Sequence, residues 1–408
     1  MSIVFAADLH LSSYIWSGRS DLHGDAEWAL HQLVDIACER QAEWLVAAGD
    51  LIDKKVNDSP PIDSLGRQLR RLMDCGVQFG YVQGQHEMAD PPWVQTVSGS
   101  SLHLHGKLTK IGPFLTYGLD YQRTSDIPEA FGAIPKGTNM VIAHQVWEEF
   151  MGSRAQASMA VIPHAEYCIT GDFHKFVSKT IAGKTGQKMR CFSPGATHMR
   201  KIDEPDEHYC IIWDAGKFVK KRLHSRPFRL IELNTVRELD EFCADIKSDL
   251  DQLAAGNAHL PEHIRKPIFK IKYRIELPEA QARILSAIND RAFVFEEQIW
   301  PETETQQISR QKRDELVKLG LEGCLELIVP DKESALYSDT LTVLQASRDS
   351  GQIADAIASI KARFLGDNNV AEESEVAECV SARTSGLDVS PGIDRSDRPQ
   401  RVGKIQRR

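Results

Sequence analysis

Short apolar segments alternate with helix-periodic segments from the N-terminus to Thr170, and this alternation restricts the folds open to the chain. Trp44–Ala48 (WLVAA) has the length and composition of a buried strand. His23–Gln41 carries apolar residues at helical spacing, and Ile62–Cys75 also indicates a helix. Further strands are predicted at Ser2–Ala7, Val77–Val82, Met140–Ala143 and Tyr167–Thr170. Strands and helices in this order predict a layered α/β domain.

Polar residues of the kinds that bind divalent metals follow these predicted strands. The clusters are Asp8-Leu9-His10, Gly49-Asp50-Leu51-Ile52-Asp53, Gly84-Gln85-His86-Glu87, Ala143-His144-Gln145 and Gly171-Asp172-Phe173-His174. Taken singly, each is more often a surface pair, a turn or a hydrogen-bonded core histidine. All of them together, each at a strand end where α/β sheets build their sites, predict a metal centre.

The order of the clusters resembles the D-x-H, G-D-x-x-D, G-N-H-[DE], H, G-H-x-H pattern of calcineurin-like metallophosphoesterases. Within that family, Ser193–Thr197 and Lys201–Glu204 resemble the corresponding stretch of SbcD-type DNA repair nucleases, a group that includes the phage recombination endonuclease subunit. The resemblance implies an α/β fold. Its core would be a layered β-sandwich flanked by helices, followed by a small α+β capping domain and a C-terminal helical segment.

The resemblance also implies two metal sites and the role of each residue. Metal one would be held by Asp8, His10, Asp50 and His174, and metal two by Asp50, Gln85, His144 and Asp172. His86 would act as a general acid or phosphate clamp, oriented by Asp53. From the residues alone, Asp53 is equally well a helix N-cap or turn residue. The implied cofactor is Mn²⁺, two ions per chain, with Mg²⁺ as the alternative.

Two positions depart from the family pattern, and both belong to metal two. The family has Asn where this chain has Gln85, and His where it has Asp172. Both replacements still offer an oxygen ligand. Metal two is therefore either an oxygen-richer site or a weakened one.

The composition of the chain changes at Lys217–Arg229 (KFVKKRLHSRPFR), which is rich in basic residues. Such a run is often only a solvated face, but it also suits DNA phosphates. The candidate DNA-binding residues are Lys217, Lys220, Lys221 and Arg222. A β-α-β-α-β pattern follows. The expected divisions are 1–225 for the nuclease domain, 226–302 for a capping and DNA-binding domain, 303–366 for a helical segment that binds an ATPase partner, and 367–408 for a disordered tail.

The composition excludes several classes of protein. With 49 Lys and Arg against 58 Asp and Glu, the net charge is −9, so the chain does not bind nucleic acid through bulk positive charge. It has no apolar stretch long enough for a membrane span and no signal-peptide pattern, so a cytoplasmic location without membrane contact is expected. The 8 cysteines form no CxxC pair, which favours reduced core thiols. His103 and His105 alternate on a predicted strand, where an exposed face is favoured over a metal site.

The resemblance implies a Mn-dependent phosphodiesterase that cleaves DNA ends as an exonuclease and endonuclease. The implied partners are DNA, an SMC-like ATPase of the SbcC type, and a second copy of the chain, with helices near Pro61–Cys75 and Pro91–Ser98 as dimer candidates. One alternative is a phosphatase or phosphodiesterase of small substrates, against which the segments after Arg226 argue. Another is a DNA-end scaffold with an impaired second metal site.

Overall fold

The structure is a computed structural model, and it describes residues 2–299 and helix α10, Ala335–Ala346. Within the first range, residues 13–15, 17–18, 20, 55–58, 164, 183–185, 275–276 and 278 are not described. The described residues divide into two units, residues 2–299 in the first and α10 in the second. The helices expected at Ile308–Leu319 and Gln352–Phe364, and the tail from Asp367, lie outside the described residues.

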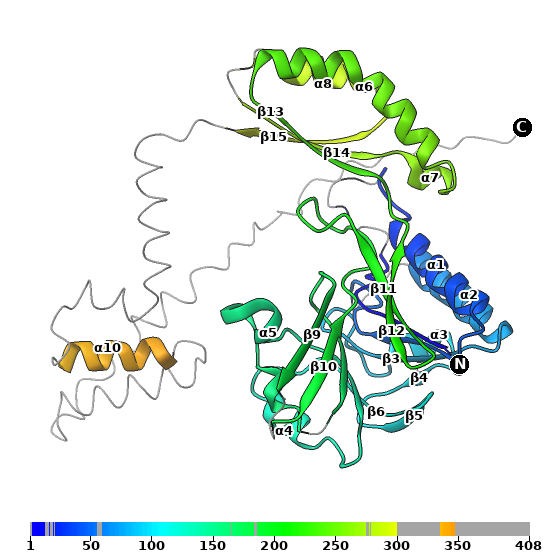
Figure 1. The fold of residues 1–408 in the computed structure, drawn as a ribbon, viewed down its shortest axis with the longest axis vertical. Coiled ribbons are helices and arrows are strands. Elements are labelled where there is room, and N and C mark those ends of the chain that lie inside the picture. The colour runs from blue at the N-terminus through cyan, green and yellow to red at the C-terminus, as the bar shows by residue number, and fades with distance from the viewer. Residues whose placement is uncertain are drawn as a thin grey trace, which may run out of the picture. The chain divides into compact units, whose positions relative to one another are not determined.

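Two large sheets form the body of the first unit (Figure 1). The first sheet has six strands in the order β12-β11-β1-β2-β3-β4, and the second has six in the order β5-β6-β7-β8-β10-β9. In the first sheet the strands are β1 (Ser2–Ala6), β2 (Trp44–Ala48), β3 (Gln78–Val82), β4 (Leu102–His103), β11 (His208–Asp214) and β12 (Lys217–Leu223). In the second they are β5 (Leu108–Ile111), β6 (Phe114–Leu119), β7 (Met140–His144), β8 (Tyr167–Gly171), β9 (Val177–Ala182) and β10 (Lys188–Ser193).

The strands that carry the predicted metal-binding clusters are parallel to their neighbours. β1, β2 and β3 are parallel in the first sheet, and β7 and β8 are parallel in the second. Every residue of β1, β2 and β7 is buried. Burial on both faces explains why these strands appear in the sequence as unbroken apolar runs. The expected α/β fold of stacked sheets flanked by helices is confirmed.

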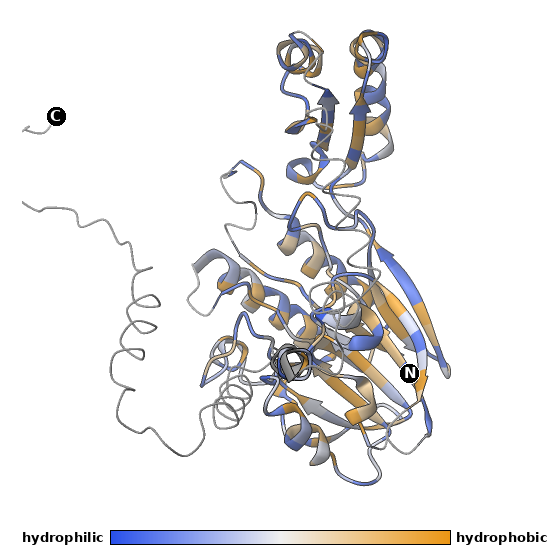
Figure 2. Ribbon diagram, turned by 90° about the vertical axis from the view of Figure 1, so that its left-hand side faces the viewer, coloured by the Kyte–Doolittle hydropathy of each residue, from blue (hydrophilic) through white to orange (hydrophobic). Residues whose placement is uncertain are grey.

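The alternation of side chains along β1 shows how the layers form. Ile3 and Phe5 pack between the two sheets, against Ile142 of the second sheet. Val4 points to the opposite face, into the core that contains Leu30. That outer face is covered by α1 (Asp25–Glu39) and α2 (Ser59–Asp74). Figure 2 shows hydrophobic residues concentrated in the strands of the two large sheets.

Shorter elements complete the two-sheet body. The helices α4 (Ile127–Gly132) and α5 (Glu148–Met151), with the 3₁₀ turns η1 (Gly152–Arg154) and η2 (Met159–Val161), lie beside the second sheet, whereas α3 (Trp93–Val97) packs against α2. Phe131, Trp147 and Met159 pack with Val141 of β7 in a third apolar cluster. Within the described part of the chain, no helix combines the length and apolar character that a membrane span requires.

A smaller parallel sheet follows, in the order β13-β14-β15. Its elements are β13 (Phe228–Leu233), α6 (Val236–Gly256), α7 (Glu262–Arg265), β14 (Ile268–Arg274), α8 (Ala280–Ile288) and β15 (Phe293–Ile299). The predicted β-α-β-α-β pattern is therefore confirmed. Helix α6 begins with a capping box, in which the Thr235 side chain accepts from the Glu238 backbone and the Glu238 side chain accepts from the Thr235 backbone.

Arg226 connects this smaller sheet to α1. Its guanidinium donates to the Asp25 carboxylate at 2.9 and 3.0 Å, and also to the carbonyls of His23 and Lys266. Only 6% of Arg226 is exposed, so four hydrogen bonds compensate a buried charge. The basic run of the sequence thus contains at least one residue with a structural role.

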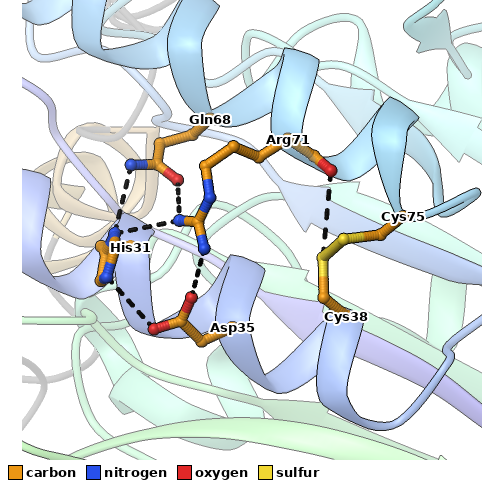
Figure 3. The surroundings of a disulfide bond; sticks show 6 residues. All are labelled: His31, Asp35, Cys38, Gln68, Arg71 and Cys75. Atoms are coloured by element: carbon orange, nitrogen blue, oxygen red, sulfur yellow. Dashed lines mark hydrogen bonds and ion pairs between the residues drawn. A yellow bond between two sulfur atoms is a disulfide. The ribbon is translucent and has the colours of Figure 1, made fainter.

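A disulfide joins Cys38, in the last turn of α1, to Cys75, directly after α2 (Figure 3). The expectation of reduced thiols is wrong for this pair, because the two helices bring together cysteines that are 37 residues apart. Beside it, Arg71 of α2 donates to Asp35 of α1 at 2.6 Å. Among the other described cysteines, Cys168, Cys191 and Cys210 are buried and free, and Cys243 is partly buried and free.

Replacing Cys75 by Ser should destabilise the oxidised protein. A closed loop of 37 residues restricts the unfolded chain, which corresponds to about 3–4 kcal/mol of unfolding free energy. The measurement is urea unfolding of both proteins with and without dithiothreitol. The reductant should lower the stability of the unmutated chain and leave Cys75→Ser unchanged. Equal stability of the two oxidised proteins would show that the bridge does not contribute.

Candidate metal centre

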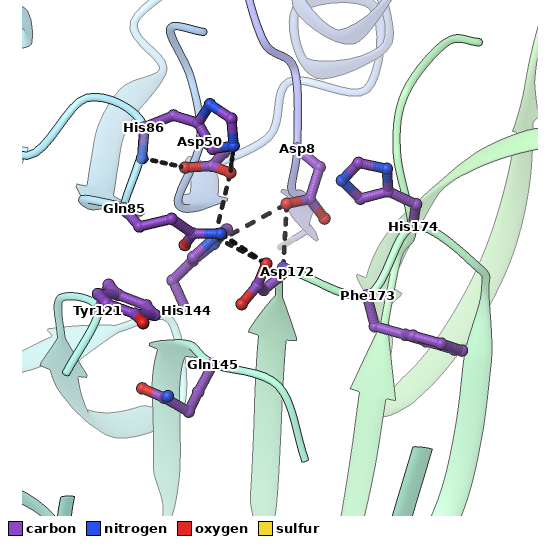
Figure 4. Close-up of polar contacts among 12 residues, drawn as sticks. Asp8, Asp50, Gln85, His86, Tyr121, His144, Gln145, Asp172, Phe173 and His174 are labelled. Carbon is purple, nitrogen blue, oxygen red and sulfur yellow. Dashed lines mark hydrogen bonds and ion pairs between the residues drawn. The ribbon is translucent and has the colours of Figure 1, made fainter. Parts of the chain in front are cut away.

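The clusters predicted from the sequence converge at one place in the fold. They follow the carboxyl ends of β1, β2 and β3 in the first sheet and of β7 and β8 in the second. Figure 4 shows side chains from both sheets pointing toward one another, including those of Asp8, Asp50, His144, Asp172 and His174. The parallel direction of these strands brings residues distant in sequence to the same edge.

The backbone at this edge is strained. Four non-glycine residues have left-handed conformations, with φ of 53° at Asp8, 45° at His10, 49° at Asp50 and 72° at Asp172. Such conformations are uncommon outside glycine and cost about 1–3 kcal/mol each. Their concentration at predicted metal ligands indicates that the surrounding sheets hold these side chains in place for a function.

Glycines allow the cluster to close. A Cβ atom at Gly49 would overlap the His144 ring, and one at Gly84 would overlap the Asp50 carboxylate. Gly49 also has φ of 87°, which favours glycine independently of the contact. The glycines of the sequence motifs therefore serve the close approach of the functional side chains.

The residues predicted for metal one lie close together. Asp8, His10 and His174 each offer a ligand atom within 4.8 Å of the others. His10 Nε2 lies 3.4 Å from His174 Nε2 and 3.5 Å from Asp50 Oδ2. This spacing matches side chains that could share one cation.

The residues predicted for metal two also meet. Asp50 and His144 fall in a group of ligand atoms within 4.8 Å of one another, and its third member is Asp8, a residue predicted for metal one. His144 Nε2 is 3.3 Å from Asp50 Oδ2. Asp172 Oδ1 is 4.0 Å from the same nitrogen. The two residues that depart from the family pattern contact each other, since the Gln85 amide donates to Asp172 Oδ1 at 2.7 Å. The two departures are therefore in direct contact in the structure.

Hydrogen bonds orient two of the imidazoles. His144 Nδ1 donates to the Ala48 carbonyl at 2.7 Å, and His174 Nδ1 lies 2.7 Å from Glu204 Oε1. A partner on Nδ1 fixes the ring and leaves Nε2 to face the cluster, which is the usual arrangement of metal-binding histidines. Burial alone would raise the pKa of Glu204, but the bond to His174 lowers it to about 2.

His86 and Asp53 are neighbours, as predicted, but their contact runs mainly through the backbone. His86 Nδ1 donates to the Asp53 carbonyl at 2.9 Å, whereas the Asp53 carboxylate is 3.6 Å away. The His86 backbone N–H donates to Asp50 Oδ1 at 3.1 Å. The side chain is about one third exposed, at 35%, so it is open to a substrate beside the buried carboxylates.

Arg200 was missed by the sequence reasoning. Its guanidinium donates to Asp53 Oδ1 at 2.8 Å and to His10 Nε2 at 2.7 Å. Arg200 therefore forms an ion pair with the Asp53 carboxylate. Arg200 lies between two quoted stretches of the sequence, Ser193–Thr197 and Lys201–Glu204, and nothing in its spacing signals the site.

Buried negative charge dominates the centre. Asp8 is fully buried and Asp50 is 1% exposed. Burial raises the pKa of Asp8 to about 6. Burial would also raise the pKa of Asp50, but His144 and His10 outweigh it and lower that pKa. Burial tends to lower the pKa of His144, but Asp50 and Asp8 outweigh it and raise that pKa well above its ordinary value.

The side chains present fit a divalent metal. Asp8 Oδ2 and Gln85 Oε1 are buried and have no hydrogen-bond partner among the described residues. Leaving such oxygens unpaired is costly, and a cation would satisfy them. Carboxylate and amide oxygens with imidazole nitrogens are a donor set that suits Mn²⁺ and Mg²⁺.

The candidate DNA-binding residues on β12 do not share one face. Along this strand Phe218 packs between the large sheets, so Lys220 and Arg222 project to that side, and Lys217 and Lys221 project to the other. Lys220 lies over the rings of Tyr209 and Phe176, and Arg222 pairs with Glu207. Lys217 is opposite Asp214 of β11, and Asp214 is opposite Ser2 of β1. Lys217 therefore lies level with the start of β1, whereas Asp8 follows the end of that strand.

Comparison with known proteins agrees with this geometry. A sequence model of the family described as calcineurin-like phosphoesterase matches residues 1–176. This range contains every predicted metal ligand. No curated protein matched the chain in a sequence search. The N-terminal part of the chain thus carries a calcineurin-like metallophosphoesterase domain, a class of metal-dependent phosphoester hydrolases.

Solved structures resemble the chain only distantly. A crystal structure of a dimetal phosphatase from Danio rerio aligns with 12% identity and a TM-score of 0.34, over 54% of this chain and 95% of that one. Another crystal structure aligns with 13% identity and a TM-score of 0.36, over 55% of this chain and 99% of that one. At these TM-scores neither likeness carries an argument about this chain.

Replacing Asp50 by Asn should abolish most of the stabilisation that metal confers. Divalent metal at one hundred times its Kd stabilises a folded protein by about 2.7 kcal/mol. Asp50 belongs to two groups of candidate ligand atoms, one with Asp8 and His144 and one with His10 and His86, and Asn tolerates its left-handed backbone. The measurement is thermal unfolding with and without Mn²⁺.

Asp290→Asn is the matched control, because Asp290 is exposed and also has a positive φ, of 57°. It should keep the full metal-induced rise in Tm. An equal rise in Asp50→Asn would contradict the expectation that the Asp50 charge is required for metal binding.

Proposed function

We propose that the chain is a Mn-dependent DNA nuclease, a phosphodiesterase that acts on DNA ends as an exonuclease and endonuclease in recombination or break repair. The observation that best supports phosphoester hydrolysis is a cluster of possible metal ligands at the strand ends of the two large sheets. Its members are Asp8, His10, Asp50, His144 and His174. The SbcD-like stretch Ser193–Thr197 supports DNA as the substrate.

Metals bound by these residues would supply an activated water and a clamp for the scissile phosphate. Asp8, His10, Asp50 and His174 would hold the first, and Asp50, Gln85, His144 and Asp172 the second. The chain contributes the geometry, because its sheets, glycines and Nδ1 hydrogen bonds fix these side chains before substrate arrives.

His86 is the group proposed to meet the substrate. Its Nδ1 is held by the Asp53 carbonyl, so its Nε2 is directed toward the Asp50 side of the centre, 3.8 Å from Asp50 Oδ2. From there it can donate a proton or a hydrogen bond to the leaving oxygen. Asp53 and Arg200 form the supporting pair on the other side of His10.

Two further features support a large substrate. The smaller β13-β14-β15 sheet is fastened to α1 by the buried Arg226–Asp25 pair, an addition that hydrolysis of a small ester does not require. Lys217 and Lys221 are exposed on β12 and are available to phosphates, with Lys220 and Arg222 on the other face of the strand.

The proposed nuclease would work as a homodimer in the cytoplasm, together with an SMC-like ATPase of the SbcC type. Helices α2 and α3 correspond to the segments predicted for the dimer contact. The segment predicted for the ATPase, 303–366, includes α10. These assignments rest on the SbcD-like sequence pattern.

Replacing His86 by Ala should reduce Mn-dependent cleavage of DNA by about 10²-fold or more, as expected for loss of an acid or clamp. Metal binding should persist, because the proposed ligands are intact. Cleavage of a labelled duplex is the measurement, with the exposed His259→Ala as control. Near-normal cleavage by His86→Ala would contradict its role, and absence of Mn-dependent cleavage by the unmutated chain would contradict the proposed function.

Replacing Asp172 by Asn should weaken the second metal only. Asn keeps an oxygen for the Gln85 amide and removes the charge that attracts the cation. Calorimetric titration should give two equivalents of Mn²⁺ for the unmutated chain and one tight equivalent for the variant. In activity assays, Zn²⁺ should be a poor activator of both proteins. Asp203→Asn, at an exposed carboxylate, is the control. One equivalent in both proteins would favour the scaffold alternative.

A further inference from the structure

A cavity of about 840 Å³ adjoins the candidate metal centre, a size within the range of small-molecule sites. Gln85, whose amide contacts Asp172, lines one part of it. His103, His105 and Tyr121 line another. Figure 4 shows Tyr121 on the same side of the centre as Gln85. The cavity therefore borders the candidate metal centre at Gln85.

A stack of flat rings runs from the core into this cavity. The Tyr81 and His103 rings are 5.0 Å apart at an interplanar angle of 11°, and the His103 and His105 rings are 5.9 Å apart at 24°. Tyr81 is fully buried, and His105 is exposed. The stack thus ends in an imidazole that is accessible to a further planar group.

Asp120 fixes both imidazoles. Its carboxylate oxygens lie 2.9 Å from His103 Nε2, and its backbone N–H donates to His105 Nδ1 at 3.0 Å. The carboxylate also accepts from the Gln83 backbone at 2.7 Å. Since Nδ1 of His105 accepts, the proton of the neutral ring is on Nε2, which can donate to a ligand. The expectation of an exposed strand face is wrong for His103, whose side chain is only 15% exposed.

The charges around the cavity disfavour an anionic ligand. Asp90, Asp120 and Asp126 line it, against one arginine, Arg123. A second phosphate would meet net negative charge there. Amide side chains, including that of Gln122, supply donors and acceptors to the same space. A planar neutral ring with a polar edge matches these properties.

We propose that this cavity is a nucleobase subsite, in which a base stacks on His105 while the phosphate of the same nucleotide lies at the Asp8–Asp50–His144 group. The proposal rests on the proposed phosphodiesterase function and names the part of the substrate that this cavity holds. Aromatic platforms of this kind accept bases with little sequence preference. A base inserted here has left the duplex stack, so the bound nucleotide belongs to a single strand or a frayed end.

The test compares two chromogenic phosphodiesters in the full chain with Mn²⁺. Thymidine 5′-(p-nitrophenyl phosphate) carries a base, and bis(p-nitrophenyl) phosphate does not. The ratio of kcat/KM for the first over the second should fall about tenfold in His105→Ala, chiefly through KM. His105→Phe keeps the ring and should retain most of the ratio.

An unchanged ratio in His105→Ala would overturn the subsite, and so would an equal loss on both esters, which indicates a structural role. Calorimetric binding of thymidine 5′-monophosphate separates this inference from the proposed function. If the unmutated chain hydrolyses neither ester nor DNA, the proposed function fails. Weaker binding by His105→Ala than by His105→Phe would still support the subsite, and equal binding would overturn it.

Discussion

The burial of two carboxylates, Asp8 and Asp50, at the meeting of the two large sheets is the constraint on which the site depends. Neither is open to water, and a buried charge needs a partner of opposite sign. His144 supplies part of that charge, which is why its pKa is raised while that of Asp50 is lowered. A divalent cation would supply the rest of the positive charge. It would also bind Asp8 Oδ2, which has no hydrogen-bond partner among the described residues.

The rest of the centre holds these groups in position. Left-handed backbone at Asp8 and Asp50 is sustained by the preceding strands β1 and β2, every residue of which is buried, since strain persists only where the surrounding structure is rigid. The Ala48 carbonyl and Glu204 turn the rings of His144 and His174 toward the cluster. Groups outside the cluster therefore hold the candidate ligands in position for a metal.

The Gln85–Asp172 contact brings together the two residues that depart from the family pattern. Each alone would alter the site, since Gln is longer than Asn and Asp exchanges an imidazole for a charge. Together they form a hydrogen bond of 2.7 Å across the candidate second site. The pair also marks the boundary with the adjoining cavity, because Gln85 lines it. Gln85 is thus both a candidate metal ligand that departs from the family pattern and a lining residue of the adjoining cavity.

The sequence by itself determined the strands that precede the metal-binding clusters, and the clusters themselves, because buried parallel strands appear as apolar runs and their carboxyl ends gather the residues that follow them. Trp44–Ala48 was predicted with its observed bounds for this reason. Only the tertiary structure decided which distant residues meet: Cys38 with Cys75, Arg200 with Asp53 and His10, and His103 with Asp120. The same holds for the basic run Lys217–Arg229. Strand alternation places its β12 residues on two opposite faces, and Arg226 instead forms a buried ion pair with Asp25. Local periodicity carries information about neighbours along the chain, whereas these contacts depend on how helices and sheets pack against one another.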